Sequence, residues 1–118
     1  MSSLLTPFYH YTSEYGKNAI ISFGYISANP ANGIHAHFGP GTYGTSLPPS
    51  KGKYVIANNN WQAWGNKYIS QGKVDWAIKL MIPACELEKT GGSFRDILLH
   101  RGPIYLNAYK WTAIQVPF

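Results

Sequence analysis

An alternation of apolar residues with others over residues 74–82 constrains the fold of this chain more than any other feature. The apolar positions are Val74, Trp76, Ile78, Leu80 and Ile82, and the residues between them are Asp75, Ala77, Lys79 and Met81. Successive side chains of a β-strand point to opposite faces of its sheet, so a period of two predicts a half-buried strand. Such a strand buries its apolar face against other elements, and the chain is therefore expected to fold around a sheet.

Other segments predict further strands and two helices. Aromatic and β-branched residues at 8–12 predict a first strand, and Ser13 is placed to cap a helix that ends at Gly24. Ser50 is placed to cap a second helix that runs to about Trp64. Short strands are also expected over residues 25–27, 94–99 and 111–116. With about six or seven short strands and two helices, the fold class is expected to be α+β.

The composition favours one folded domain over residues 1–118. Hydrophobic residues make up 45% and charged residues 13%, which is too apolar and too weakly charged for a disordered chain. No run approaches the roughly 20 apolar residues of a membrane span, and the N-terminus lacks the pattern of an export signal. We expect a cytoplasmic protein, a monomer without a membrane partner. The single cysteine, Cys85, excludes an internal disulfide and is expected to fill the core.

The net charge of +5 is compatible with an anionic partner such as nucleic acid. It arises from eight Lys and two Arg against three Glu and two Asp. The Lys residues are scattered, with no basic run and no Arg cluster. Ordinary surface charge therefore explains the balance better than a nucleic-acid-binding patch does.

Few residues of the chain are suited to acid, base or electrostatic work. The acidic residues are Glu14, Asp75, Glu86, Glu88 and Asp96. His35 and His37 alternate in a loop, but no Cys or further His is spaced to complete a zinc set, so no metal site is expected. No Ser lies in a nucleophile elbow, and no phosphate loop of the Walker type is present.

Three segments carry the chemistry when they are taken together. They are Phe8-Tyr9-His10-Tyr11-Thr12, before the first helix; Phe38-Gly39-Pro40-Gly41-Thr42-Tyr43, followed by Leu47-Pro48-Pro49; and Arg95-Asp96-Ile97-Leu98-Leu99-His100-Arg101-Gly102. In this order they resemble the ADP-ribosyltransferase family of the diphtheria-toxin and poly-ADP-ribose-polymerase type. The match in detail is to the toxin-related group with a His, Tyr and Asp (HYD) signature. The resemblance implies a small split β-sheet core and NAD as the substrate.

The resemblance also implies a role for each matching residue of the first two segments. His10 would bond the adenosine ribose of NAD, and the backbone at Tyr11 would hold the amide of nicotinamide. Thr12 and Gly41 would belong to the same NAD-binding site. A glycine such as Gly41 lets the backbone approach a ligand closely. Tyr43 would stack on the nicotinamide ring.

In the third segment the catalytic position would fall to Asp96, with His10 and Tyr43 completing the catalytic set. Tyr54, eleven residues after Tyr43 and on the expected second helix, would cover the other face of the nicotinamide ring. Most of the wider family has Glu at the catalytic position and an acidic or Gln residue two positions earlier, where this chain has Phe94. The departure at Phe94 puts transfer to arginine in doubt.

These residue types suit the chemistry that the resemblance implies. Departure of nicotinamide builds positive charge on the ribose, as in glycoside cleavage, and one well-placed carboxylate stabilises that charge. Each residue also has a plain structural explanation. His10 could be a core histidine, Tyr43 an ordinary strand aromatic, and Asp96 one half of a surface pair with Arg95.

The leading hypothesis is mono-ADP-ribosyl transfer from NAD to a macromolecular acceptor, either protein or nucleic acid. Two alternatives stay open: NAD hydrolysis with water as the acceptor, and a non-catalytic module that binds NAD, ADP-ribose or nucleic acid. RNA 2′-phosphotransferases share the fold but rely on several His and Arg in the site, whereas this chain offers only Arg95 and Arg101. The sequence does not separate a free-standing enzyme from an effector or a toxin tip.

Overall fold

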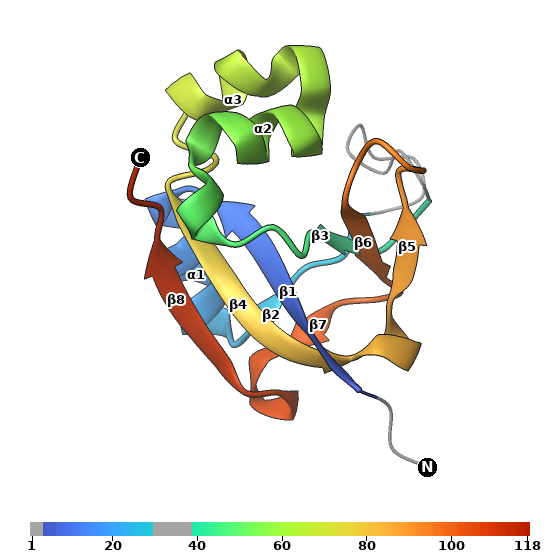
Figure 1. Cartoon of the computed structure of the whole chain (residues 1–118). Helices are drawn as coiled ribbons and strands as arrows, with labels where there is room; N and C mark the ends of the chain where they lie inside the picture. Colours follow the sequence, from blue (N-terminus) through green and yellow to red (C-terminus); the bar gives the residue numbers. More distant parts are fainter. Residues whose placement is uncertain (1–3, 30–38) are drawn as a thin grey trace.

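The computed structural model describes residues 4–29 and 39–118, and in this part of the chain it shows the expected α+β fold (Figure 1). One sheet has the order β1-β4-β8, with strands Leu5–Thr12, Trp76–Pro83 and Trp111–Gln115. A second sheet has the order β3-β6-β5, with strands Thr42–Gly44, Ile97–His100 and Glu88–Thr90. A third sheet pairs β2 (Tyr25–Ile26) with β7 (Ile104–Tyr105). All of these pairs are antiparallel.

The alternating segment forms β4, the middle strand of the first sheet, which confirms the prediction for residues 74–82 apart from a start two residues later, at Trp76. Its register sets Leu80 opposite Phe8 and Ile78 opposite His10. Leu80 and Ile78 are fully buried. Pairing with β4 therefore fixes the position of His10 on β1, an edge strand of this sheet.

The first helix, α1 (Glu14–Phe23), has the predicted caps. The Ser13 hydroxyl accepts a hydrogen bond from the backbone N–H of Gly16 at 3.0 Å, which satisfies one of the free donors of the first turn. Gly24 ends the helix with φ of 81°, a left-handed conformation that glycine adopts without strain. In Figure 1, α1 lies behind the first sheet, on the side away from α2.

The second predicted helix is found in pieces and extends beyond its predicted end. A 3₁₀ turn (Pro49–Lys51) precedes α2 (Lys53–Trp61), and a second 3₁₀ turn (Gln62–Trp64) leads into α3 (Gly65–Ser70). The break falls at Gln62, whose φ is 52°. Helix α3 packs on α2 at Gly65, where a Cβ would lie 3.1 Å from the backbone of Ala57. The glycine that allows this close packing is a weak helix former, which is why the sequence pattern missed α3.

Both faces of the β1–β4 pair contribute to a hydrophobic core. Phe8 of β1 packs with Ile78, Leu80 and Ile104 on one face, next to Ile20 of α1. Tyr9 and Tyr11 of the same strand pack with Ile56 and Ala57 of α2 on the other face. Alternate residues of β1 thus enter two separate cores, and the strand is held in place from both sides.

Two sequence predictions fail near the C-terminal half of the chain. The strand predicted over 94–99 begins only at Ile97, because Gly91 and Gly92, both at positive φ, make a turn that leaves Phe94 at the surface. Cys85 is exposed rather than buried, since β4 ends at Pro83 and Cys85 lies in the 3₁₀ turn Ala84–Glu86 beyond it. Within residues 4–29 and 39–118, no helix has the length and apolar character to cross a membrane.

Candidate functional site

The first and second sheets meet at one point and then separate, which leaves a split between β1 and β3. Tyr9 and Thr45 form an isolated bridge, with N···O distances of 2.8 and 3.0 Å, and among the described residues this pairing does not extend to Tyr11. Alternate residues of an antiparallel strand present their backbone groups to the same side. The N–H and C=O of Tyr11 therefore face the split and are available to a ligand there.

His10 lies in this split and is fixed by one hydrogen bond. Its Nδ1 lies 2.9 Å from the carbonyl oxygen of Tyr43, 33 residues away in the chain. A carbonyl oxygen only accepts, so Nδ1 carries the proton and donates it. Burial lowers the pKa of His10 below its ordinary value, which keeps the ring neutral and leaves Nε2 as a hydrogen-bond acceptor.

A cleft of about 360 Å³ opens beside His10 and Tyr43, so the structure brings these two predicted residues together. Its other walls come from α1 and from the segment that follows it, with Ile20, Phe23, Tyr25 and Asn29 among the lining residues. Sequence reasoning missed these residues. The signal for these walls in the sequence was the pair of aromatic residues, Phe23 and Tyr25, on either side of the capping Gly24.

Asp96 directly precedes β6 and lies next to the residues that follow β3. Its Oδ1 accepts hydrogen bonds from the Thr45 hydroxyl at 3.0 Å and from the Ser46 backbone N–H at 2.8 Å, and its Oδ2 accepts one from the Ser46 hydroxyl. Among the described residues, Asp96 does not line the cleft that His10 and Tyr43 share. Its carboxylate is instead hydrogen-bonded to Thr45 and Ser46, the two residues that follow β3, the strand that carries Tyr43.

The surface-pair explanation of Asp96 does not match its surroundings. Arg95 donates from Nε to the backbone carbonyl of Asn59 at 2.8 Å and from Nη2 to that of Asn60. The Asn59 side chain in turn holds the backbone of Asp96, with Oδ1 2.7 Å from its N–H and Nδ2 2.9 Å from its C=O. Helix α2 therefore fixes the Asp96 main chain, while Thr45 and Ser46 fix its carboxylate.

The sequence reasoning did not single out Thr45, Ser46 or Asn59. The signal for the first two was present, because two hydroxyl residues directly follow Tyr43-Gly44. Nothing local marks Asn59, which is the second of three consecutive asparagines in α2. Its role depends on where α2 lies relative to β6.

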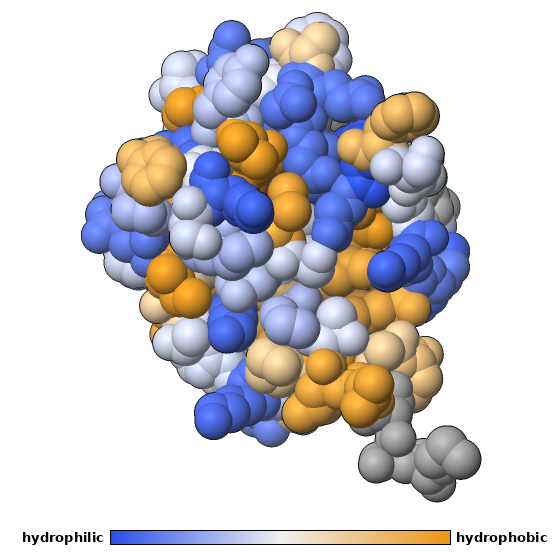
Figure 2. Space-filling model, in the orientation of Figure 1, coloured by the Kyte–Doolittle hydropathy of each residue, from blue (hydrophilic) through white to orange (hydrophobic). Residues whose placement is uncertain are grey.

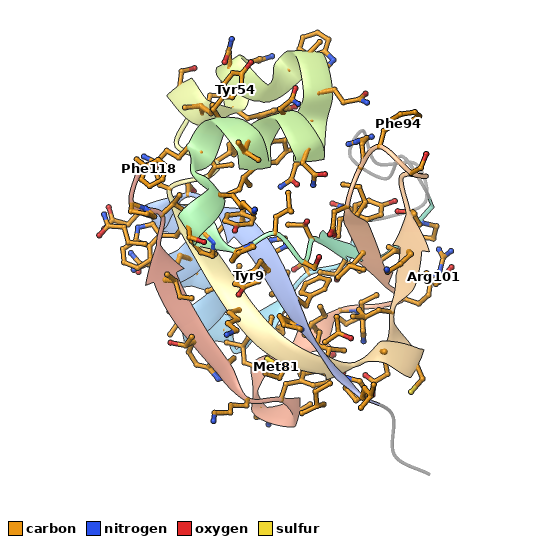
Figure 3. All side chains as sticks on the ribbon, viewed as in Figure 1. Tyr9, Tyr54, Met81, Phe94, Arg101 and Phe118 are labelled. Carbon is orange, nitrogen blue, oxygen red and sulfur yellow. The ribbon has the colours of Figure 1, made fainter. Side chains whose placement is uncertain are left out.

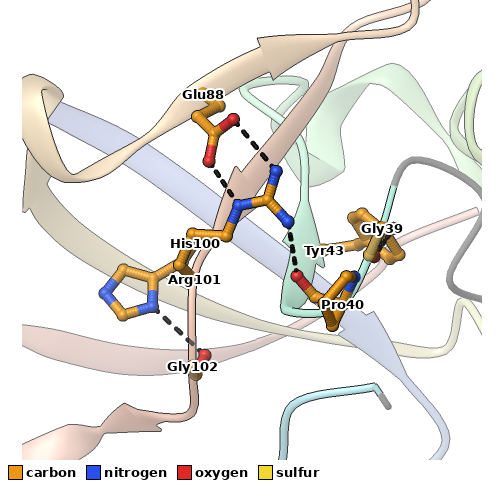
Figure 4. A network of polar contacts seen from close by, with 7 residues as sticks. All are labelled: Gly39, Pro40, Tyr43, Glu88, His100, Arg101 and Gly102. Carbon is orange, nitrogen blue, oxygen red and sulfur yellow. Dashed lines mark hydrogen bonds and ion pairs between the residues drawn. The ribbon is translucent and has the colours of Figure 1, made fainter. Parts of the chain in front are cut away.

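The turn before β3 is held around Tyr43 by a network of polar contacts (Figure 4). The Tyr43 hydroxyl donates to the carbonyl of Gly39, and Arg101 Nη1 donates to the carbonyl of Pro40 at 2.9 Å. Arg101 also pairs with Glu88, with Nε···Oε2 at 2.6 Å and Nη2···Oε1 at 3.2 Å. This hydrogen-bonded pair lowers the pKa of Glu88 below its ordinary value. Arg101 thus links β5 and β6 to the turn that positions the Tyr43 ring.

Thr12 and Gly41, both expected in the NAD site, have structural roles here and do not line the cleft. Gly41 forms backbone hydrogen bonds with Asn29, and a Cβ on it would lie 2.6 Å from the carbonyl oxygen of His100. Thr12 packs so closely on Gly16 that a Cβ there would lie 2.1 Å from its Oγ1. The first glycine lets β3 approach β6, and the second lets α1 approach β1.

The two remaining tyrosines of the expected site point elsewhere. Tyr54 is 69% exposed and lies over a separate depression at the end of the molecule formed by α2 and α3 (Figure 3), so it is not brought together with Tyr43. The Tyr11 side chain is buried and donates to the carbonyl of Leu47 at 2.6 Å. Burial also raises the pKa of Tyr11. Only the backbone of Tyr11 is available to a ligand in the split.

The described residues include no group of three or more His, Cys, Asp or Glu side chains arranged to hold a metal ion. His35 and His37, the alternating histidines of the sequence, lie outside the described residues.

Comparison with known proteins bears on this arrangement. The model of a family described as HYD1 signature containing ADP-ribosyltransferase matches residues 8–98 of the chain. The matched range begins in β1, two residues before His10, and ends in β6, two residues after Asp96. No curated protein and no solved structure matches.

Proposed function

The chain belongs to the family of ADP-ribosyltransferases that contain the HYD1 signature, and from this premise we propose that it cleaves NAD and transfers ADP-ribose to a macromolecular acceptor. The observation that carries this proposal is the convergence of His10 and Tyr43 on one cleft beside the open backbone of Tyr11. Each of these groups offers one contact that a bound NAD requires.

The split between β1 and β3 suits the nicotinamide end of NAD. The N–H of Tyr11 can donate to the carboxamide oxygen, and its C=O can accept from the carboxamide nitrogen. The Tyr43 ring supplies a flat face for stacking, held by the hydroxyl's bond to Gly39. Neutral His10, with its proton on Nδ1, can accept a ribose hydroxyl's hydrogen bond at Nε2.

Asp96 does not line the cleft, but its carboxylate is tied through Thr45 and Ser46 to the end of the strand that carries Tyr43, and we assign to it the stabilisation of the transition-state charge. When the bond between nicotinamide and C1′ breaks, nicotinamide leaves with the bonding electrons and the ribose becomes positively charged. A carboxylate that is already oriented stabilises this charge without reorganising. The three hydrogen bonds from Thr45 and Ser46 supply that orientation, and an acceptor group then bonds to C1′ and releases its proton.

The test of the proposal is nicotinamide release at saturating NAD by the wild type and by Asp96→Asn. Asparagine keeps the size of the side chain and an oxygen that can accept from Thr45 and Ser46, but it removes the negative charge. We expect turnover to fall about 10²- to 10³-fold, as for loss of other preorganised electrostatic contacts, with little change in NAD affinity.

Because Asp96 also links β6 to the end of β3, its variant needs a structural control. Ser46→Ala removes one of the hydrogen bonds to the same carboxylate but keeps its charge, and we expect a smaller loss of turnover from it. Thermal unfolding of both variants shows whether the strands still pair. If Asp96→Asn folds normally and turns over within about threefold of wild type, a barrier change of only about 0.7 kcal/mol, the catalytic role of Asp96 is wrong.

A further inference from the structure

The outward face of α2 and α3 combines exposed aromatic rings with side-chain amides. Tyr54 is 69% exposed and Trp64 is 63% exposed, an unusual degree of exposure for such large rings. Tyr54 lines a depression of about 160 Å³ together with Asn58, Gln62 and Asn66, and Trp64 lies in the turn that joins α2 to α3. We call Tyr54, Asn58, Gln62, Trp64 and Asn66, with the neighbouring Lys67, the helical face.

The charged side chains of α2 and α3 are both lysines, Lys53 and Lys67. No Asp or Glu occurs between Glu14 and Asp75, a stretch that contains all of α2 and α3. The Asp75 carboxylate forms an ion pair with Lys53, with Nζ···Oδ1 at 3.0 Å. Lys67 is exposed and its Nζ lies 5.5 Å from the centre of the Trp64 ring. Figure 2 shows hydrophilic residues around isolated apolar ones over this end of the molecule.

The backbone at the centre of the helical face is held in a costly conformation. Gln62 has φ of 52° and ψ of −121°, a combination that residues with a Cβ rarely adopt. This residue lies in the depression and directs the chain from α2 into the turn that carries Trp64. The surrounding packing therefore maintains the placement of Gln62 and Trp64 against local strain.

The helical face is joined to the site through a single helix. Asn59 of α2 holds the backbone of Asp96 at 2.7 and 2.9 Å, and the adjacent Asn58 lines the depression. The depression and the segment that contains Asp96 therefore contact the same helix.

We propose that the helical face binds single-stranded nucleic acid and that nucleic acid is the acceptor of ADP-ribose; the second clause rests on the proposed function. Exposed rings such as Trp64 and Tyr54 stack on unpaired bases, and amides such as that of Asn66 bond to base edges. Lys67 binds phosphate. In the transfer, nicotinamide leaves with the electrons of the C1′–N bond, and an N–H or O–H group of the nucleic acid bonds to C1′ and loses its proton to water.

Binding is tested first, without NAD, so that its outcome does not depend on catalysis. Fluorescence anisotropy with single-stranded DNA and RNA oligonucleotides of mixed sequence gives the affinity, and a duplex of the same sequence serves as competitor. We expect Trp64→Ala to weaken binding about tenfold, in line with loss of one base–aromatic stack. Lys67→Gln should weaken it less and reduce its dependence on salt.

Matched controls come from other parts of the surface. Tyr15→Ala removes a ring that is 85% exposed on α1, and Lys110→Gln removes a charge next to β8. Both should bind oligonucleotide like the wild type. Equal losses from control and helical-face variants, or tighter binding of the duplex than of the single strand, would overturn the assignment of this face.

Transfer is tested with NAD labelled on the adenine and a mixture of oligonucleotide and cell protein. We expect label on the oligonucleotide, reduced by Trp64→Ala while nicotinamide release in the absence of acceptor is unchanged. Label on protein alone, with normal nicotinamide release, would overturn the nucleic-acid acceptor and leave the proposed function standing. Oligonucleotide binding without any nicotinamide release would do the reverse, since binding by the helical face would stand and the enzymatic function would fail.

Discussion

His10 is both a structural and a chemical residue, because one ring nitrogen is used by the fold and the other is left for a ligand. Nδ1 donates to Tyr43 across the split at 2.9 Å. The hydrogen bond of Nδ1 is therefore the structural part of the role of His10. The other part depends on the ring staying neutral, which ties both stability and NAD binding to pH.

The pH dependence of stability follows from the lowered pKa of His10. The unfolded chain, with a histidine pKa of 6.5, takes up a proton more readily than the folded chain does. Stability from this group is therefore full above about pH 6.5 and falls as the pH decreases towards the lowered folded pKa. We expect His10→Asn to flatten this part of a urea-denaturation profile. Parallel profiles for wild type and variant would contradict the burial of His10.

A second prediction for single residues concerns the contributions of Tyr43 and Tyr54 to NAD affinity. Tyr43→Ala should weaken NAD binding by about 0.5 to 1.5 kcal/mol beyond the area effect, because a stacking face is lost. Tyr43→Phe keeps the ring and should bind nearly as well. Tyr54→Ala should leave NAD affinity unchanged, since Tyr54 lies over a different depression. Calorimetric titration with NAD measures these affinities. If Tyr43 and Tyr54 covered the two faces of the nicotinamide ring, as expected from the sequence, both alanine variants would lose affinity.

At the scale of elements, the site is made where β1, β3 and β6 diverge rather than by any one of them. Thr45 pairs with Tyr9 through its backbone and with Asp96 through its side chain, so it joins all three segments. The glycine-rich turn that leads into β3 is anchored from outside by Arg101. The position of Tyr43 in the cleft therefore depends on β5 and β6 as well as on its own strand.

Arg101→Gln tests this anchoring. It removes the pair with Glu88 and the bond to Pro40, so we expect the KM for NAD to rise while kcat changes little, because Arg101 acts through the turn and not on the reacting atoms. Arg101→Lys should restore part of the loss. Lys89→Gln, on the neighbouring strand β5, is the control and should behave as wild type. A fall in kcat at constant KM would show that Arg101 acts directly in catalysis.

At the scale of the whole molecule, one sheet holds two cores together. Ile78 lies in the core between the first sheet and β7, and Ile56 lies in the core beneath α2. Since β1 and β4 contribute to both cores, neither core can be lost without exposing the other. This arrangement supports our proposal that residues 1–118 form one domain.

A single cooperative transition is the expected consequence. Ile78→Ala and Ile56→Ala should each lower the free energy of unfolding by about 2–5 kcal/mol and shift the same transition, while Ile21→Ala, at a partly exposed site on α1, should have a small effect. Calorimetry at several protein concentrations checks this, and a constant midpoint is expected for a monomer. Two separate transitions, each sensitive to one variant, would show two domains.

Features that depend on neighbouring residues could be predicted from the sequence by itself. The alternation over residues 74–82 predicted β4, and Ser13 and Gly24 predicted both ends of α1, because strand pleating and helix capping act over a few residues. The three motifs likewise indicated the family, because each is a short run of neighbouring residues and their order is a property of the chain alone. His10 and Tyr43 were identified in this way and do share a cleft.

What only the tertiary structure decided is which distant residues meet. Asp96 is held by Thr45 and Ser46, about 50 residues earlier in the chain, and no local pattern links them. The break at Gln62 separates α2 from α3, Gly65 lets the two helices pack closely at Ala57, and Tyr54 of α2 lies outside the cleft. These outcomes depend on packing and on backbone hydrogen bonds between elements, whose geometry is defined only when the whole chain is folded.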